Sequence, residues 1–346
     1  MLKKVKIIAT IGPNSNSPEI LGAFKERGVD FIRINLSHTN IEDIEEKVKI
    51  LKNHSNIPII LDTEGPQVRT GNESEIEFIE GDTVKLYNRA VDCDAKNVYL
   101  TPEHIVNSFK KGDKISLAFG SALLTVSDTS LRRVHGYLEC NVLQGGVFGG
   151  RKAVHIESPN FDLPDFSKKD LEAFEIAKKY GVKHFTLSFM EHPESVDKVR
   201  KIVAGSVLYS KIESQEGVRR FDEIADRSNG ILIDRGDLSS EVPIELIPFI
   251  QKDLTKRARE KGIEAFVATD TLQNMFSSLR PNAADANDIA NTLLDGITGI
   301  ALTKETAVGK YPIQTVDMLR SIINTYESYM ADNLLPRNHF KDKSYL

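Results

Sequence analysis

Charged residues end two apolar runs in the second half of the chain, and their types suit metal binding. The first run, "VLYSKIES", carries Lys211 and Glu213, and the second, "GILIDRGD", ends in Asp234 and Asp237. Short apolar runs of this kind predict buried strands. Carboxylates at neighbouring strand ends suit Mg²⁺, a hard cation that takes one or two carboxylates plus ligand oxygens. We therefore predict a divalent-metal site at Glu213 and Asp237, against the alternative of two solvated rim acids.

Lys211 lies two residues before Glu213, so both side chains leave the predicted strand on the same side. A lysine beside a metal site can stabilise a phosphoryl group in transfer. It can also serve as the counter-ion of Glu213, and the two roles are compatible.

Other predicted strands also end in polar side chains. Oxygens that suit a monovalent cation follow the second and third strands, on Asn35, Ser37, Asp62 and Thr63. Arg33 and Arg69 are candidate phosphate anchors, although a surface salt bridge is the commoner role of an arginine. His38 fits either a phosphate contact or a structural imidazole, and the sequence leaves both readings open.

The elements that position these residues alternate regularly between strand and helix. Strand-like runs cover residues 4–12, 30–38, 57–65, 184–190, 207–213, 230–236, 265–270 and 299–305. A helical stretch follows each run, once after an insertion. Eight such units predict a TIM (β/α)8 barrel, in which chemistry gathers at the carboxyl ends of the strands. The polar residues named above fall at or near those ends, with Arg69 just beyond the third strand.

The pattern changes between residues 72 and 155, where short strand-like pieces such as "ALLTVSD" and "LECNVLQGGVF" replace the helices. We expect an inserted small β-barrel lid domain at 72–155, after strand 3. Residues 1–71 and 156–346 then form the catalytic barrel, and "ESPNFDLPDF" is the return linker.

Composition narrows the class of protein. The 346 residues fit one large barrel or two domains. A net charge of −5 argues against a nucleic-acid partner, which would need a basic surface. No apolar stretch has the length of a membrane span, and two cysteines are too few for a disulfide framework. We therefore expect a cytoplasmic protein without a membrane partner.

Several long motifs resemble those of the pyruvate kinase family, in that family's order. They include "KIIATIGPNS", "RINLSHTN", "SKIESQEGVRRFDEI", "GILIDRGDL" and "ANDIANTLLDG", and the resemblance runs from residue 4 to about residue 330. It implies a glycolytic, ATP-binding transferase of the TIM-barrel type that moves a phosphoryl group from phosphoenolpyruvate to ADP and releases pyruvate. The implied cofactors are Mg²⁺ or Mn²⁺, and K⁺. The implied ligands are phosphoenolpyruvate or pyruvate and ADP or ATP.

The resemblance also implies residue roles. Catalysis is assigned to Lys211 at the phosphoryl group, Thr269 at protonation of the enolate, and Arg33 near the phosphates. The implied cation ligands are Glu213 and Asp237 for the divalent ion, and Asn35, Ser37, Asp62 and Thr63 for potassium. The implied contacts to the substrate and nucleotide are Asp234, Arg235 and Gly236 for the substrate, and Arg69, His38 and Lys152 for the nucleotide.

The chain departs from the family pattern at several rim positions. The family's "DTKGPEIRTG" reads "DTEGPQVRTG", which places Glu64 and Gln67, and Ala118-Phe119-Gly120 replaces an Asp-Asp-Gly of the lid. "SFIR" reads "SFME", with Glu191, and "ARGDLG" reads "DRGDLS", with Asp234 where a small residue belongs. The family's C-terminal effector domain has no counterpart here, so we expect no activation by sugar phosphates. A homodimer is compatible with this, whereas a tetramer is not expected.

Four functions remain open. They are a pyruvate kinase, a homologue with a different phosphoryl acceptor or donor in a biosynthetic pathway, a metal-dependent lyase acting on pyruvate or phosphoenolpyruvate, and a non-catalytic relative. Lys211 and the lid argue against the lyase, because carbon–carbon cleavage needs no phosphoryl clamp. Asp234 has two readings of its own: an acid paired with a nearby Arg or Lys, or an acid that recognises an unusual substrate or holds a second cation.

Overall fold

The computed structural model describes residues 4–118, 120–156 and 163–332. These residues form two compact units, one of residues 1–65 with 165–346 and the other of residues 66–164. The boundaries expected from sequence, 71/72 and 155/156, lie inside the second unit. Phe119 and most of the return linker fall outside the described residues. Among the described residues, no helix is both long and apolar enough to cross a membrane.

The first unit is a closed barrel of parallel strands, which confirms the predicted fold class. Its strands are β1 (Lys6–Thr10), β2 (Phe31–Asn35), β3 (Ile59–Asp62), β13 (His184–Leu187), β14 (Val207–Ile212), β15 (Gly230–Asp234), β16 (Glu264–Ala268) and β17 (Gly299–Leu302). Each strand pairs with the next, and β1 closes the ring by pairing with β17, Lys6 opposite Gly299. Every predicted barrel strand is therefore present.

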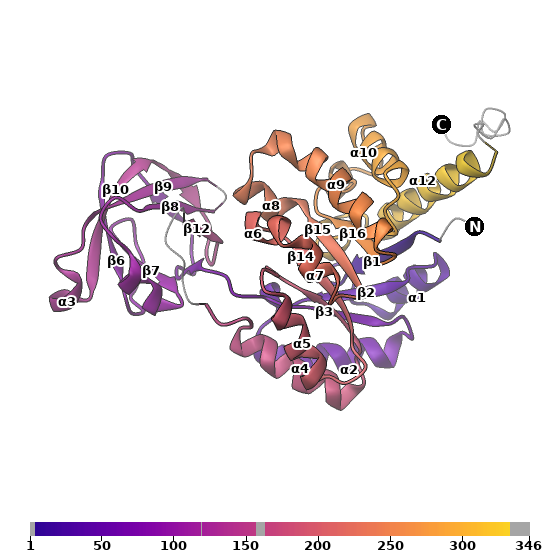
Figure 1. Ribbon diagram of the computed structural model, residues 1–346, viewed down its shortest axis with the longest axis horizontal. Helices are drawn as coiled ribbons and strands as arrows, with labels where there is room; N and C mark the ends of the chain where they lie inside the picture. The colour runs from indigo at the N-terminus through magenta and orange to yellow at the C-terminus, as the bar shows by residue number, and fades with distance from the viewer. Residues whose placement is uncertain (1–3, 119, 157–162, 333–346) are drawn as a thin grey trace. The chain divides into compact units, whose positions relative to one another are not determined.

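Helices surround this barrel (Figure 1). The principal ones are α1 (Pro18–Glu26), α2 (Ile44–His54), α4 (Lys168–Tyr180), α5 (Pro193–Ile202), α7 (Phe221–Ala225), α9 (Ile247–Glu260), α10 (Ala283–Leu294) and α12 (Pro312–Asp332). Local sequence explains where they begin. The Ser17 side chain accepts the amide of Ile20 ahead of Pro18 at α1, and Ser167 and Asp170 form a reciprocal capping box at α4.

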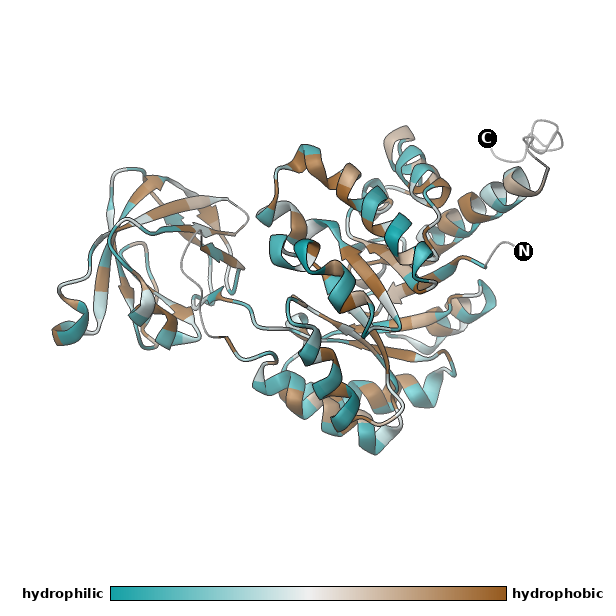
Figure 2. Ribbon diagram, viewed as in Figure 1, coloured by the Kyte–Doolittle hydropathy of each residue, from teal (hydrophilic) through white to brown (hydrophobic). Residues whose placement is uncertain are grey.

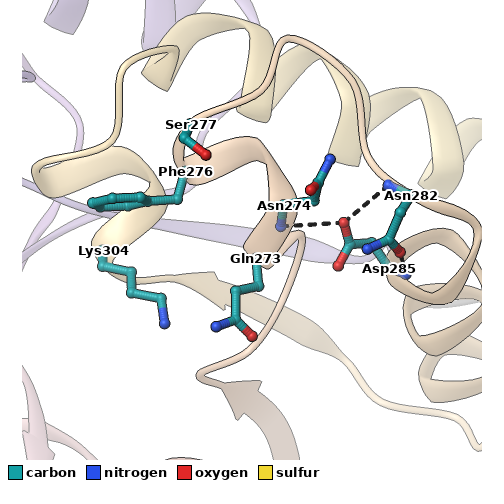
Figure 3. A pocket seen from close by; sticks show the side chains of 7 residues that line it. All are labelled: Gln273, Asn274, Phe276, Ser277, Asn282, Asp285 and Lys304. Atoms are coloured by element: carbon teal, nitrogen blue, oxygen red, sulfur yellow. Dashed lines mark hydrogen bonds between the residues drawn. The ribbon is translucent and has the colours of Figure 1, made fainter.

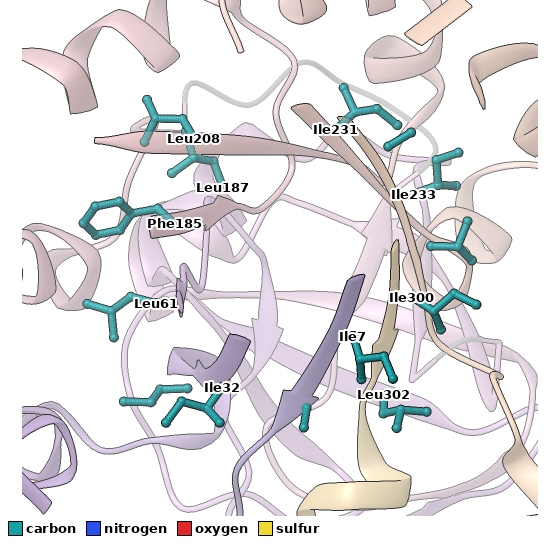
Figure 4. Close-up of a cluster of buried hydrophobic side chains, with 14 of the residues drawn as sticks. Ile7, Ile32, Leu61, Phe185, Leu187, Leu208, Ile231, Ile233, Ile300 and Leu302 are labelled. Atoms are coloured by element: carbon teal, nitrogen blue, oxygen red, sulfur yellow. The ribbon is translucent and has the colours of Figure 1, made fainter. Parts of the chain in front are cut away.

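Successive strand residues face two different cores. Ile7 belongs to the large apolar layer between strands and helices, whereas its neighbour Ile8 belongs to a small cluster inside the barrel. Figure 4 shows strand side chains of the outer layer, and Figure 2 shows apolar residues on the strands with polar residues on the outer helix faces. Inside the barrel, the Tyr209 and Phe266 rings meet edge to face at 5.0 Å. A Cβ on Gly299 would lie 2.3 Å from the Phe266 ring, so a larger residue does not fit there.

The second unit is a separate small β structure with its own apolar core. Its main sheet has the order β12-β8-β9-β10-β6-β7-β4, and an isolated bridge from Arg69 to Ala153 brings its edges together. The strands of this unit are β4 (Arg69–Thr70), β5 (Ile76–Phe78), β6 (Thr83–Tyr87), β7 (Asn97–Thr101), β8 (Lys114–Leu117), β9 (Ala122–Asp128), β10 (Tyr137–Gln144), β11 (Gly146–Phe148) and β12 (Val154–Ile156). The small inserted barrel is thus confirmed, although β4, β7 and β12 were not predicted.

Candidate active site

Strand register brings the predicted residues to one end of the first unit's barrel. On β14 and β15, Lys211 lies opposite Leu232, so Glu213 ends at nearly the level of Asp234. Asp234 pairs in turn with Ala268, directly before Thr269. On the other side, Asp62 of β3 lies opposite Asn35 and Thr186. Residues far apart in the sequence therefore share the carboxyl rim of the strands.

Lys211 lies at the centre of this group. Its Nζ lies 2.7 Å from Glu213 Oε1, 3.3 Å from Asp234 Oδ2 and 3.6 Å from Asp62 Oδ1, and it donates a hydrogen bond to Ser188 Oγ at 3.2 Å. Burial alone would lower the pKa of Lys211, but the carboxylates of Asp62, Glu213 and Asp234 outweigh burial and raise it. Lys211 is therefore a buried ammonium at neutral pH.

Glu213 places a carboxylate oxygen at the rim of the barrel. The residue is 1% exposed, and its Oε2 accepts the backbone amide of Phe189 at 2.6 Å. Its Oε1 has the ammonium of Lys211 nearby but no hydrogen bond of regular geometry from the described residues. Burial raises the pKa of Glu213, Lys211 opposes that shift, and Asp237 and Asp234 add to it. A bound cation would favour the ionised carboxylate.

Asp234 ends β15 and is buried rather than solvated. Its Oδ1 accepts the Thr269 hydroxyl at 2.6 Å and the Gly236 amide at 3.3 Å. Burial would raise the pKa of Asp234, but Lys211, the Thr269 hydrogen bond and Arg33 lower it. This is the paired arrangement that one reading of the sequence expects.

The acids of β14 and β15 could hold a metal ion. Asp237 lies in the first turn of α8 (Arg235–Glu241) and is half-buried. Glu213, Asp234 and Asp237 each present one carboxylate oxygen, and these oxygens all lie within 4.8 Å of one another. An all-carboxylate donor set fits Mg²⁺ or Mn²⁺, and the Oε1 of Glu213 remains available for such an ion.

Arg33 forms a buried pair with Asp62, not a surface salt bridge. Its NH2 lies 2.6 Å from Asp62 Oδ2, and its NH1 donates to Thr10 Oγ1 at 3.0 Å. The other oxygen of Asp62 accepts the Thr186 hydroxyl at 2.6 Å. Burial would lower the pKa of Arg33, but the carboxylates of Asp62 and Asp234 raise it. Arg33 is consequently a fixed cation on the rim.

The predicted potassium ligands follow β2 and β3. Asn35 Oδ1 accepts the amide of Ser37 at 2.9 Å. Thr63 Oγ1 accepts the amide of Ser188 at 2.8 Å, and its carbonyl accepts the Ser188 hydroxyl at 2.6 Å. The donor types, amide, hydroxyl, carbonyl and carboxylate oxygens, fit a monovalent cation. Asp62 is the most engaged of the set, since both of its oxygens already accept hydrogen bonds.

Thr269 stands in a backbone conformation unusual for a β-branched residue, with φ of +69°. Its carbonyl accepts both Nε and NH2 of Arg235, at 3.0 and 2.9 Å. Asp288 on α10 holds the same guanidinium through two contacts of 2.7 and 2.8 Å. Gly236 accommodates Thr269, because a Cβ on Gly236 would lie 2.8 Å from Thr269 Cγ2. The Arg235 side chain therefore fixes the Thr269 loop.

The remaining predicted residues lie in different settings. His38 is exposed at the end of the 3-10 helix Leu36–His38. Arg69 and Lys152 belong to the second unit, where Arg69 NH1 donates to the Arg151 carbonyl and the Lys152 amide donates to Thr70 Oγ1.

The residues that depart from the family pattern have the following surroundings. Glu64 pairs with Lys169 at 3.0 Å, and Ala118 adopts a left-handed conformation with φ of +51°. The Glu191 carbonyl accepts Arg220 NH1 at 3.2 Å.

Sequence reasoning missed several residues that support the site. Ser188 and Thr186 contact Lys211 and Asp62, and Asp288 fixes Arg235. Ser188 lies near the end of the predicted strand 184–190, and this position was the one available signal. Asp288 gave none, because it comes from a helix far along the chain.

A polar pocket of about 420 Å³ lies elsewhere on the loops after β16 and β17 (Figure 3). Lys304 and Gln273 extend into it, whereas Asp285 accepts the amides of Asn274 and Asn282. It contains none of the residues predicted to act in catalysis.

Comparison with known proteins agrees with this geometry. A family model described as "Pyruvate kinase, barrel domain" matches residues 2–316. The chain is 33% identical over 337 residues to the pyruvate kinase of Thermococcus litoralis. This alignment covers 94% of the present chain and 70% of that protein. It is 35% identical over 330 residues to the pyruvate kinase of Aeropyrum pernix, covering 92% of this chain and 70% of that protein. For the pyruvate kinase of Borreliella burgdorferi, the identity is 33% over 349 residues, covering 99% and 72%. The chain therefore belongs to the pyruvate kinase family.

Proposed function

We propose that this chain catalyses the transfer of a phosphoryl group from phosphoenolpyruvate to ADP, with uptake of one proton and release of pyruvate. The observation that carries the proposal is the buried ammonium of Lys211, which lies among Glu213, Asp234 and Asp62 at the rim. A fixed cation in a water-poor site stabilises negative charge that develops on a phosphoryl group in transfer.

Different residues act in the two halves of the reaction, which are phosphoryl transfer and protonation of the enolate. Lys211 and Arg33 supply positive charge for the phosphoryl oxygens of the donor. We assign the contacts to the substrate to Asp234, Arg235 and Gly236, in support of which the Gly236 amide and the Thr269 hydroxyl hold Asp234 in place. Thr269 holds a proton on its Oγ1, and we assign to it the support of enolate protonation. Its backbone carbonyl accepts Arg235, which keeps the hydroxyl in place.

Glu213 and Asp237 would hold a divalent cation, Mg²⁺ or Mn²⁺. When bound, such an ion neutralises phosphate and carboxylate oxygens of the substrates. We assign a potassium ion to Asn35, Ser37, Asp62 and Thr63, and contacts to the nucleotide to His38, Arg69 and Lys152.

A coupled assay tests the proposal. Purified protein with phosphoenolpyruvate, ADP and Mg²⁺ should form equal amounts of ATP and pyruvate, and omission of Mg²⁺ should abolish both. Parallel reactions with and without K⁺ test the monovalent site, and other nucleoside diphosphates test the acceptor. Glu213→Gln should fold normally and lose turnover. Pyruvate formation at the wild-type rate by Glu213→Gln, or by the metal-free protein, would refute the metal assignment. If no pyruvate forms when ADP is supplied, the assignment of ADP as the phosphoryl acceptor is refuted.

A further inference from the structure

Asp234 belongs to the same carboxylate group as the two proposed metal ligands. One oxygen from each of Glu213, Asp234 and Asp237 lies within 4.8 Å of the other two. Asp234 ends β15, and Asp237 follows it in the first turn of α8. The end of β15 and the first turn of α8 thus bring these two acids close to Glu213, which follows β14.

The charges of the rim leave room for a divalent cation. The group of charges around Lys211 consists of four carboxylates, those of Asp62, Glu213, Asp234 and Asp237, and two cations, Arg33 and Lys211 itself. In the ionised state this leaves a formal excess of two negative charges. Without Asp234 the excess would be one. Like charges at this spacing repel in a water-poor site, and a divalent ion would remove the repulsion.

A second observation points into the same space. Glu213 Oε1 is buried and accepts no hydrogen bond of regular geometry from the described residues. A buried carboxylate oxygen normally has a hydrogen-bond donor. Lys211 Nζ, at 2.7 Å, gives this oxygen an ionic neighbour that a metal ion could replace.

The Asp234 carboxylate is already fixed in orientation. Its Oδ1 is held by the Thr269 hydroxyl at 2.6 Å and by the Gly236 amide at 3.3 Å. Its Oδ2 faces Lys211 at 3.3 Å, toward Glu213. An oxygen that is already oriented can bind a cation without further loss of side-chain freedom.

We propose that Asp234 is a third protein carboxylate for the divalent cation, beside Glu213 and Asp237. The inference rests on the metal site of the proposed function and adds one ligand to it. More ionised ligands raise the affinity of a hard cation.

The test is Mn²⁺ binding to the whole chain without substrate or nucleotide, measured by electron paramagnetic resonance of free Mn²⁺. The variants are Asp234→Ala, Asp234→Asn and Glu213→Gln. The control is Asp270→Asn, which removes one negative charge from an exposed rim acid paired with Lys304 at 3.7 Å. We expect Asp234→Ala and Asp234→Asn to raise the Kd by about 10- to 100-fold, the loss typical of weakening a metal site. The control should bind as the wild type does.

Thermal unfolding with and without Mn²⁺ gives an independent readout, because a cation bound only by the folded state raises the Tm. The Mn²⁺-dependent rise should shrink in both Asp234 variants. Should the alanine variant not fold, Asp234→Asn carries the test, since its shape is nearly that of aspartate.

Each contrary outcome has a distinct meaning. Unchanged affinity in the Asp234 variants, with binding lost in Glu213→Gln, would overturn this inference and leave the proposed function standing. An equal loss in Asp270→Asn would also overturn it, because the effect would then be long-range charge. Wild-type binding by Glu213→Gln would instead overturn the metal site on which the proposed function depends.

Discussion

Lys211 remains charged in a buried position because three acids surround its ammonium within 3.6 Å. An ammonium without these partners would lose its proton when buried. The acids depend on Lys211 in the same way, so removal of the lysine leaves carboxylates buried beside one another. The rim is therefore a coupled set in which no single charge can be altered without effect on the others.

Replacement of Lys211 by Met should separate the two halves of the reaction. Phosphoryl transfer should fall by about 10²- to 10³-fold or more, because a central electrostatic stabiliser is lost. Exchange of pyruvate methyl protons with solvent, followed by NMR in D₂O, should fall far less, since Thr269 is unchanged.

The matched control is Lys304→Met, which removes a rim cation that is 43% exposed. It should retain phosphoryl transfer. Equal loss of transfer and exchange in Lys211→Met would mean that Lys211 supports the structure and not the phosphoryl step.

At the scale of elements, much of this molecule could be predicted from its sequence. The barrel strands are buried on both faces, so each reads as an apolar run such as "GILID", and the helices between them carry clear caps. The positions of Glu213 and Asp237 followed from strand ends alone. Arg235 shows the limit, because its fixation of Thr269 depends on Asp288 from α10 and on a strained φ that no local pattern encodes. Arg69 and Thr70, which precede the expected boundary, form β4 of the second unit.

Two glycines of the barrel unit should respond to alanine in opposite directions. Gly22 lies inside α1 with no atom within 4 Å of its would-be Cβ, so Gly22→Ala should stabilise the fold by about 0.5–1 kcal/mol. Gly299 faces the Phe266 ring, so Gly299→Ala should destabilise it by about 1–3 kcal/mol. Urea unfolding of both variants measures the difference, and the same sign for both would contradict the packing described inside the barrel.

Glu45 of α2 contacts residues of α4, and this contact should affect the stability of the protein at low pH. Hydrogen bonds from Tyr180, Lys179 and Lys49 lower the pKa of Glu45 from its usual 4.5 to about 2. As the pH falls below 4.5, the unfolded chain binds the proton before the folded chain does. The contribution of Glu45 to the free energy of unfolding is therefore complete above pH 4.5 and is lost as the pH falls toward 2.

Glu45→Gln should remove this part of the pH dependence. Urea unfolding above pH 4.5 and near pH 2 measures it, with Glu172→Gln, an exposed acid of α4, as the control. A pH dependence unchanged by Glu45→Gln would show that the contact between α2 and α4 is not formed in solution.

At the scale of the whole molecule, each unit has its own apolar core. Cys140 reports on the second unit, because its thiol is fully buried and burial raises its pKa to about 12. In a Cys93→Ser background, Leu124→Ala should destabilise that unit by about 2–5 kcal/mol and speed labelling of Cys140 by a thiol reagent. Binding of Mn²⁺ should be unaffected.

The control for this experiment is Leu208→Ala, which opens a cavity in the barrel unit instead. It should not speed labelling of Cys140. Faster labelling in both variants would mean that the two units lose their structure together.

The pairing of β1 with β17 has a consequence for protein synthesis. Lys6 leaves the ribosome long before its strand partner Gly299 is added to the chain. Until then β1 has no neighbour on one side, and the ring around Lys211 cannot close. The second unit draws all its strands from residues 69–156, so it can fold while the ribosome is still working. The nascent chain therefore carries a folded small domain together with an incomplete sheet. The open edge of that sheet is prone to aggregation, so this stage of synthesis is the one at which chaperones are most needed.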